Sequence, residues 1–201
     1  MGYTLIMKCS VQSKMHTHYP CLVVKTKRIA IIDTETTGLL IRDHVIQLAI
    51  VIADVDNVDG TITICESWNT LVRPSGFHID YSIYHHVTHD DANTNGIPIA
   101  LVLNHVSEMM CKWNVKTLHA YNAAFDKRMV EEEAKRIGMP FKYEWECVLK
   151  IVRKQLPMLP SKKLQLVYTH LFPDNLQVKW HDALEDVLAT AQVFGKLTCK
   201  N

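Results

Sequence analysis

Three apolar runs lie close together between residues 29 and 72, and they constrain the fold more than any other feature of the chain. Residues 29–32, 45–53 and 61–72 are rich in β-branched residues, as buried or half-buried strands are. Residues 56–60, between the second and third runs, read Asp-Asn-Val-Asp-Gly, which is strong turn chemistry. The sequence therefore predicts three consecutive strands, of which the last two form an antiparallel hairpin.

Helical patterns dominate the chain after this hairpin. They cover residues 82–92, 99–112, 123–137, 145–155 and 163–171, and a last one begins near residue 182. Residues 115–120 form one further short strand-like run, and Gly138 and Pro140 end the helix that precedes them. Strands followed by alternating helices and a strand indicate an α/β fold.

The first 27 residues differ from the rest because they show no sustained periodicity and carry Lys8, Lys14, Lys25 and Lys27 with no acid. We interpret residues 1–27 as an N-terminal basic extension and residues 28–201 as one domain. The extension could contact nucleic acid or a partner, or be a simple terminal segment. The formal net charge of the whole chain is only +1, so any contact with a polyanion must be local.

The cysteines and the apolar runs bear on location. Six cysteines are scattered without a Cys-x-x-Cys pair, as in reduced proteins. The longest apolar run, residues 45–55, is interrupted by Gln47 and Asp54 and is far shorter than the roughly 20 residues of a membrane span. The start also lacks the apolar stretch of a secretory signal. We expect a cytoplasmic protein of a bacterial or virus-infected cell, with no membrane partner.

Two acids, Asp33 and Glu35, follow the first apolar run. Because side chains alternate along a strand, residues two apart share one face. A metal site and two solvated acids at a strand end account for this pair equally well. Asp126 stands where a predicted strand ends and a helix begins, a place in which the helix dipole favours any acid. Position alone therefore does not assign a function to these three acids.

The stretch from Trp180 to Asp186 is more informative. Asp182 followed by Glu185 resembles a capping box, with Asp182 as the N-cap and Glu185 at position N3. His181 and Asp186 then occupy positions N′ and N4, whose side chains usually make an apolar contact. An imidazole and a carboxylate in these positions break a local rule, and such breaks tend to mark functional sites.

If Asp33, Glu35, Asp126 and Asp186 converge, they need cations. Two like charges roughly 4 Å apart cost on the order of 4 kcal/mol at an effective dielectric of 20. Oxygen ligands select hard ions such as Mg²⁺ or Mn²⁺, and two such ions would balance four carboxylates. The hypothesis is a divalent metal site, which depends on a convergence that the sequence does not show.

Taken together, three motifs resemble those of the DEDDh exonucleases. They are Asp-x-Glu at Asp33 and Glu35, Asn-Ala-Ala-Phe-Asp ending at Asp126, and His-x-x-x-x-Asp from His181 to Asp186. This family includes the proofreading subunit of the bacterial replicative polymerase, exonuclease X and ribonuclease T, and the resemblance runs from about residue 28 to the C-terminus. It implies a ribonuclease H-like fold, in which three antiparallel strands and further parallel strands form a central mixed sheet flanked by helices.

The resemblance also implies roles for single residues. Asp33, Glu35 and Asp186 would bind one Mg²⁺ or Mn²⁺ ion, Asp33 and Asp126 a second, and His181 would be the general base. The substrate-binding residues would be Thr34, Thr36, Thr37, Gly38, Leu39, His85, Asn122 and Phe125. Leu39 would lie against the terminal base, although an ordinary core leucine is an equal alternative. Gln47 and His86 depart from the Glu and Gly of many members.

We therefore expect a metal-dependent 3′-5′ exonuclease that releases nucleoside monophosphates from single-stranded or frayed 3′ ends of DNA by two-metal-ion hydrolysis. It would act alone or with a DNA polymerase. Because no residue clearly reads a 2′-hydroxyl, a 3′-end-trimming exoribonuclease is the first alternative. A catalytically silent module that binds nucleic acid or a polymerase is the second.

Overall fold

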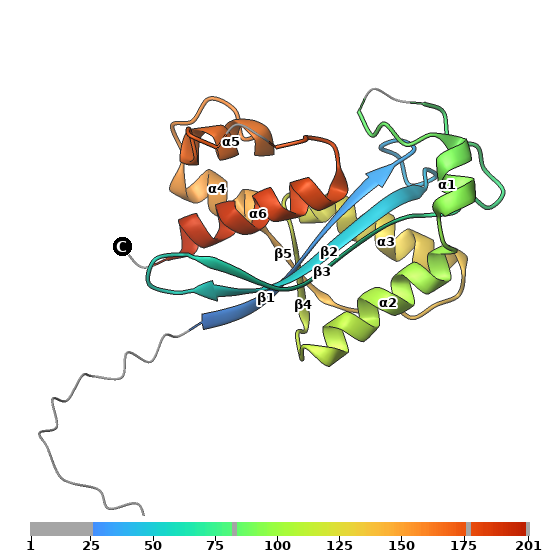
Figure 1. Ribbon diagram of the computed structural model, residues 1–201, viewed down its shortest axis with the longest axis horizontal. Coiled ribbons are helices and arrows are strands. Elements are labelled where there is room, and N and C mark those ends of the chain that lie inside the picture. The colour runs from blue at the N-terminus through green and yellow to red at the C-terminus, as the bar shows by residue number, and fades with distance from the viewer. Residues whose placement is uncertain (1–25, 82–83, 176–177, 200–201) are drawn as a thin grey trace, which may run out of the picture.

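The computed structural model describes residues 26–81, 84–175 and 178–199, and five strands within them form one sheet. The strands are β1 (Thr26–Thr36), β2 (Val45–Asp56), β3 (Ile62–Leu71), β4 (Thr117–Ala120) and β5 (Glu144–Cys147), in the order β3-β2-β1-β4-β5 (Figure 1). β1, β2 and β3 pair antiparallel, whereas β4 is parallel to β1 and β5 is parallel to β4. The expected mixed sheet is confirmed, as is the β2–β3 hairpin.

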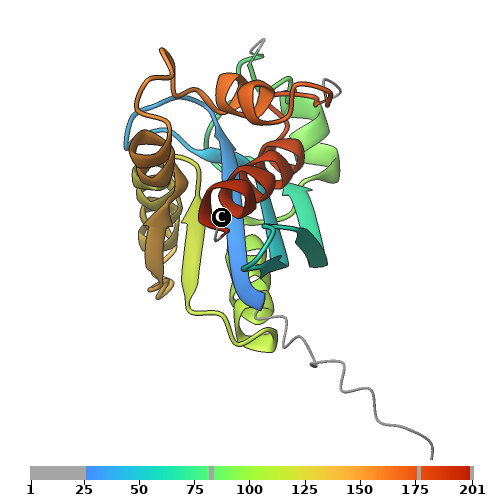
Figure 2. The same ribbon diagram turned by 90° about the vertical axis from the view of Figure 1, so that its left-hand side faces the viewer.

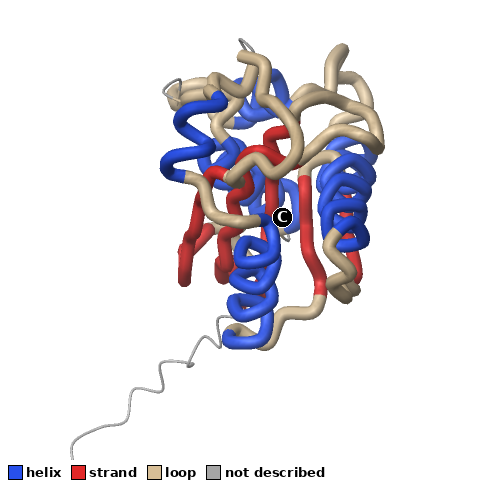
Figure 3. The backbone as a smooth tube through the Cα atoms, turned by 90° about the vertical axis from the view of Figure 1, so that its right-hand side faces the viewer, coloured by secondary structure: helices blue, strands red, loops and turns tan. Residues whose placement is uncertain are grey.

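Helices cover both faces of this sheet, so the fold has three layers. The described helices are α1 (His89–Asn95), α2 (Ile99–Lys112), α3 (Ala123–Arg136), α4 (Val148–Gln155), α5 (Leu164–Leu171) and α6 (Ala183–Thr198). α6 packs on β1 and β2 and also contacts α4 and α5 (Figure 2). α2 and α3 lie on the opposite face, so the strands are enclosed between helices (Figure 3). None of the described helices has the length and apolar character needed to cross a membrane.

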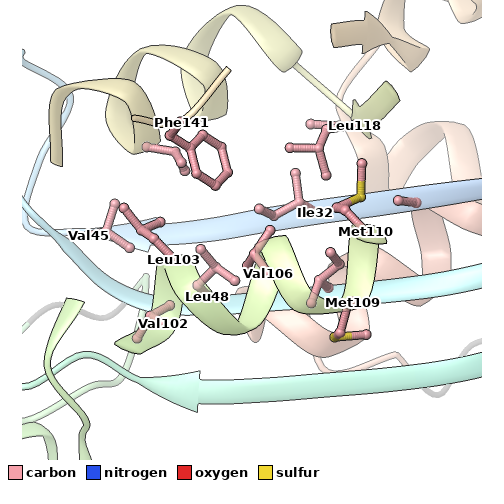
Figure 4. Packing of buried hydrophobic residues seen from close by; sticks show 14 of the residues in the cluster. Ile32, Val45, Leu48, Val102, Leu103, Val106, Met109, Met110, Leu118 and Phe141 are labelled. Atoms are coloured by element: carbon pink, nitrogen blue, oxygen red, sulfur yellow. The ribbon is translucent and has the colours of Figure 1, made fainter. Parts of the chain in front are cut away.

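Alternation along β1 divides its side chains between two cores. Ala30 and Ile32 face α2 and α3, where Ile32 lies near Leu48 of β2 and Val106 of α2 (Figure 4). Ile29 and Ile31 face the other way, into the core formed with α4, α5 and α6. Both faces are buried, which explains why these strands read as continuous apolar runs. The same alternation directs Asp33 and Glu35 towards the α6 side and Thr34 towards the α3 side.

The helix expected over residues 82–92 is confirmed only from His89 onward, and its predicted start is wrong. Residues 84–88 form a turn and irregular backbone, and α1 begins only at His89. Its start is set by Thr88, whose hydroxyl accepts a hydrogen bond from the Asp91 backbone N–H at 3.1 Å and makes Thr88 the N-cap. The helical period extended to residues that precede this N-cap, where the described backbone is not helical.

The helix expected over residues 145–155 begins three residues later, because residues 144–147 form β5. This strand pairs with β4 in the register Thr117↔Glu144 to Ala120↔Cys147. The boundary of the predicted extension also shifts, since Thr26 and Lys27 belong to β1 and pair with Asp56 and Val55. Residues 1–25 of that extension lie outside the described residues.

Candidate active site

Asp33 and Glu35 occupy the last part of β1, beside Ala49 and Gln47 of β2, and a bulge follows between Glu35 and Thr36. Burial raises the pKa of Asp33 well above its usual value, and the carboxylates of Asp126, Asp186 and Glu35 raise it further. Burial raises the pKa of Glu35 to about 8, with further contributions from the carboxylates of Asp186, Asp126 and Asp182. The acids of three separate motifs therefore lie close enough to act on one another.

Asp126 comes from the first turn of α3 and is only 3% exposed. The Thr34 hydroxyl donates a hydrogen bond of 3.0 Å to Asp126 Oδ1, so the residue between Asp33 and Glu35 orients the acid of the second motif. Burial raises the pKa of Asp126 to about 7, and hydrogen bonding from Thr34 opposes this rise. Thr34 itself is buried, with its hydroxyl engaged in this contact.

The start of α6 brings His181 and Asp186 together as the capping pattern predicted. Asp182 is the N-cap, and its Oδ1 accepts a hydrogen bond of 3.1 Å from the Leu184 N–H. One possible ligand atom from each of Glu35, His181 and Asp186 lies within 4.8 Å of the other two. His181 has φ of 64°, a left-handed conformation that is uncommon for a residue other than glycine and often accompanies function.

The donor atoms of this cluster suit a divalent cation. Asp186 Oδ1 is buried and has no hydrogen-bond partner among the described residues. Burial raises the pKa of Asp186 to about 7, although a hydrogen bond from the His181 backbone lowers it. Uncompensated buried carboxylates are costly, and oxygen donors of this kind favour Mg²⁺ or Mn²⁺. The site therefore has the charge and ligand chemistry of a metal centre.

The residues predicted to contact substrate divide into two groups, of which the first is the loop after β1. Thr36 Oγ1 donates to the Gly38 carbonyl at 2.7 Å, and Thr37 Oγ1 accepts from the His44 N–H at 2.9 Å. A Cβ atom on Gly38 would lie 2.4 Å from Asp43 Oδ2, so a larger residue there would displace the Asp43 side chain. Leu39 is 74% exposed, and the core alternative for it is therefore wrong.

The second group lies beside α3 and α1. Asn122 is exposed at the N-cap position of α3, and Phe125 is half-buried with the Arg128 guanidinium 5.5 Å from its ring centre. His85 is only 7% exposed, and its Nδ1 accepts a hydrogen bond from the Val87 N–H at 3.1 Å. Burial lowers the pKa of His85. Asn122 is thus exposed to solvent, whereas the His85 side chain is buried.

Tyr84 was missed by the sequence reasoning. Its ring lies edge-on to the His181 ring, with 5.9 Å between the ring centres, and its side chain is 65% exposed. The helix expected over residues 82–92 wrongly placed Tyr84 within a regular element, whereas residue 84 lies in a turn. An aromatic residue directly before His85 was the available signal, because aromatic rings are common nucleobase partners.

The sequence model of a family described as RNase_T exonuclease matches residues 30–194, a span that includes every acid of the cluster and His181. No curated protein matches the chain.

Several solved structures share the fold. The nuclease domain of 3'hExo, described as a DEDDh family member bound to rAMP, has a TM-score of 0.69 and 18% identity, over 86% of this chain and 92% of that chain. A full-length 3'-exonuclease has a TM-score of 0.68 and 17% identity, over 86% of this chain and 60% of that chain. The E. coli exonuclease I–ssDNA complex in its zinc-bound form has a TM-score of 0.67 and 19% identity, over 86% and 40%. The fold is thus ribonuclease H-like, and the chain spans under two thirds of the last two proteins.

Proposed function

This chain belongs to the RNase_T exonuclease family and is a DEDDh-type 3′-5′ exonuclease, and we propose that it releases nucleoside monophosphates from single-stranded or frayed 3′ ends of DNA. The observation that carries the proposal is the meeting of Glu35, His181 and Asp186 within 4.8 Å. Beside them, the carboxylate of Asp126 raises the pKa of Asp33. Acids and an imidazole in one cluster are suited to metal-assisted hydrolysis of a phosphodiester.

Divalent metal dependence is a property of this family, and we propose that the ions are two Mg²⁺ or Mn²⁺. Asp33, Glu35 and Asp186 would hold the first ion, and Asp33 with Asp126 the second. When bound, the ions would lower the pKa of the attacking water and stabilise the negative charge of the leaving 3′ oxygen. Support comes from the unpartnered Asp186 Oδ1 and from the raised pKa values of the four acids.

The protein's own residues would then orient the substrate and move one proton. His181 lies on an exposed turn just before α6, where a neutral ring nitrogen can accept the proton of the water that attacks the phosphorus. The Asp182 N-cap holds the start of α6 and thereby the spacing between His181 and Asp186. The Thr34 hydroxyl keeps Asp126 in one orientation.

The terminal nucleotide would lie over the loop after β1, between Leu39 and the start of α3. The 74% exposure of Leu39 supports a contact with the terminal base, and Asn122 and Phe125 would form the opposite wall. Asp33 and Glu35 are only partly exposed at the end of β1, so a single strand would reach them more readily than the end of a paired duplex. This supports a preference for single-stranded or frayed ends, and exonuclease I has been captured with single-stranded DNA.

A 3′-end-trimming exoribonuclease is the second candidate, because the similar 3'hExo nuclease domain is bound to rAMP. Matched DNA and RNA oligonucleotides, single-stranded and as blunt duplexes, would be digested in Mg²⁺ and their first-cleavage rates compared. The proposal predicts the fastest cleavage on single-stranded DNA. Faster removal of ribonucleotides would instead establish the exoribonuclease.

The proposal covers both a free nuclease and the proofreading partner of a DNA polymerase. If the chain were instead a catalytically silent binding module, the wild type would show no Mg²⁺-dependent cleavage. Asp33→Asn would then bind nucleic acid as the wild type does. Cleavage by the wild type together with its loss in Asp33→Asn would exclude the silent module.

A further inference from the structure

The loop from Thr37 to His44 exposes three adjacent apolar side chains, which are 74%, 52% and 57% exposed at Leu39, Leu40 and Ile41. Single exposed apolar residues are common, whereas a contiguous group beside a functional site is typical of a binding surface. We call residues 39–41 the apolar crest. These side chains can contact a nucleotide bound at the acids in a defined way only if their position relative to the acids is fixed.

The loop is closed by its own hydrogen bonds. The Thr37 N–H donates to the His44 carbonyl, and the His44 N–H donates to the Thr37 hydroxyl, both at 2.9 Å. The Leu40 N–H donates to Asp43 Oδ2 at 2.6 Å, and the Asp43 N–H donates to the Leu40 carbonyl at 3.0 Å. These bonds give the loop a defined shape, but they do not attach it to the rest of the domain.

Two arginines of α3 make that attachment. Arg136 donates from Nη1 to the Asp43 carbonyl at 2.9 Å and from Nη2 to the Ile41 carbonyl at 2.5 Å. Arg128 Nη2 donates to the Leu39 carbonyl at 2.9 Å. A guanidinium presents several donors in a rigid plane, so Arg136 can hold two carbonyls at once, which a lysine ammonium does less well.

Glu133 locks Arg136 in this orientation. Its side chain is buried, and Oε1 accepts hydrogen bonds from Arg136 Nη1 at 2.9 Å and from the Val45 N–H at 3.2 Å. The same oxygen lies 3.0 Å from His44 Nδ1. The His44 ring in turn stacks on Phe77 with 3.9 Å between ring centres and 3° between planes. The contacts of Arg136, Glu133 and His44 therefore connect α3, the start of β2 and Phe77.

The helix that holds the crest is also the helix that carries Asp126 in its first turn. We infer that Arg136 is a positioning residue of the exonuclease. Together with Arg128 and Glu133, it fixes the apolar crest relative to Asp126, so that Leu39 meets the base of the 3′-terminal nucleotide when the scissile phosphate is at the acids. The inference rests on the proposed function. The guanidinium acts through backbone carbonyls and does not touch the substrate itself.

The test compares Arg136→Met and Arg136→Lys with wild type on two single-stranded DNAs, one with a normal 3′-terminal nucleotide and one with an abasic 3′ terminus. Lys135→Met is the matched control, because Lys135 is the adjacent residue of α3, is 76% exposed and lies by Glu132. The first-cleavage rate is measured at a range of substrate concentrations. We expect Arg136→Met to lower kcat/KM roughly 10- to 100-fold on the normal terminus, as misplacement of a substrate-contacting group by about 1 Å does.

The abasic terminus should lose little, because it offers no base for Leu39 to meet. Arg136→Lys should fall between wild type and Arg136→Met, and Lys135→Met should match wild type. Leu39→Ala supplies a second route: if Arg136 acts through the crest, Arg136→Met combined with Leu39→Ala is no slower than Leu39→Ala alone. Urea unfolding of each variant identifies any loss that comes from unfolded protein.

Equal losses on both termini, or additive losses in the double variant, would overturn the inference and leave Arg136 a purely structural residue. No loss on either terminus would overturn it as well. These results leave the proposed function intact, provided that the wild type digests 3′ ends. A wild type without that activity would instead overturn the proposed function, and this inference with it.

Discussion

Replacing Asp126 by Asn should make the metal-free protein more stable at pH 8 while abolishing its activity. Asp126 is 3% exposed and lies beside the other acids of the cluster, so its negative charge is unfavourable when no cation is bound. Asn has nearly the same shape and keeps an oxygen that can accept the 3.0 Å hydrogen bond from Thr34. The variant therefore removes the charge with little change in packing.

The magnitude follows from the raised pKa. Burial moves the pKa of Asp126 from an ordinary 3.8 to about 7. Because the folded pKa lies above the unfolded one, the folded state binds the proton more tightly, and stability falls as pH rises from about 4 to about 7. One pKa unit corresponds to about 1.36 kcal/mol, so roughly three units cost on the order of 4 kcal/mol at pH 8. Loss of other hydrogen bonds to the carboxylate reduces the expected net gain to about 1–3 kcal/mol.

The assay is urea unfolding in chelator at pH 8 and pH 5, with Glu131→Gln as the control, since Glu131 is a half-exposed acid of the same helix. Asp126→Asn should unfold at higher urea than wild type at pH 8, and the gain should shrink at pH 5, where the wild-type carboxyl is protonated. Glu131→Gln should change little at either pH. If Asp126→Asn is less stable than wild type at pH 8, or gains equally at both pH values, the reasoning about the buried charge is refuted.

Three further predictions concern single contacts. Thr34→Val removes the hydroxyl that donates to Asp126 and should cost about 1–3 kcal/mol in urea unfolding with Mg²⁺ present; an unchanged midpoint would contradict that role. His181→Gln should lower kcat by roughly 10²- to 10⁴-fold and leave Mn²⁺ binding in calorimetry intact, whereas a parallel loss of binding would make His181 a metal ligand. Gly195→Ala would place a Cβ atom 2.3 Å from the Gly60 carbonyl oxygen and should destabilise by about 1–3 kcal/mol, so a variant as stable as wild type would show that α6 and the hairpin can separate freely.

The sequence predicted the acid face of β1 and the meeting of His181 with Asp186 because both depend on local geometry. Side-chain alternation on a strand places Asp33 and Glu35 on one face whatever the fold, and an N-cap at Asp182 sets which residues meet across the first turn of α6. Convergence of these groups with Asp126 depends on how β1, α3 and α6 pack. Here the order of the motifs and the family resemblance supplied what local patterns could not.

Other parts were missed because they depend on distant partners. β5 is four residues long and is a strand only because Glu144 to Cys147 pair with β4. Nothing local separates such a segment from the first turn of a helix. Arg136 and Glu133 likewise resemble ordinary charged residues of an amphipathic helix. Their importance appears only once the loop after β1 lies against α3.

The central claim is that one metal-dependent site removes nucleotides from 3′ ends. Its most direct test is the digestion of one single-stranded oligonucleotide, labelled in separate samples at its 5′ or 3′ end, by wild type and Asp186→Asn in Mg²⁺. The 5′ label should appear in a ladder of progressively shorter products, and the 3′ label should leave as a mononucleotide in the first turnover. Asp186→Asn should produce neither the ladder nor the labelled mononucleotide. Release of the 5′ label first, or wild-type rates in Asp186→Asn, would contradict the account.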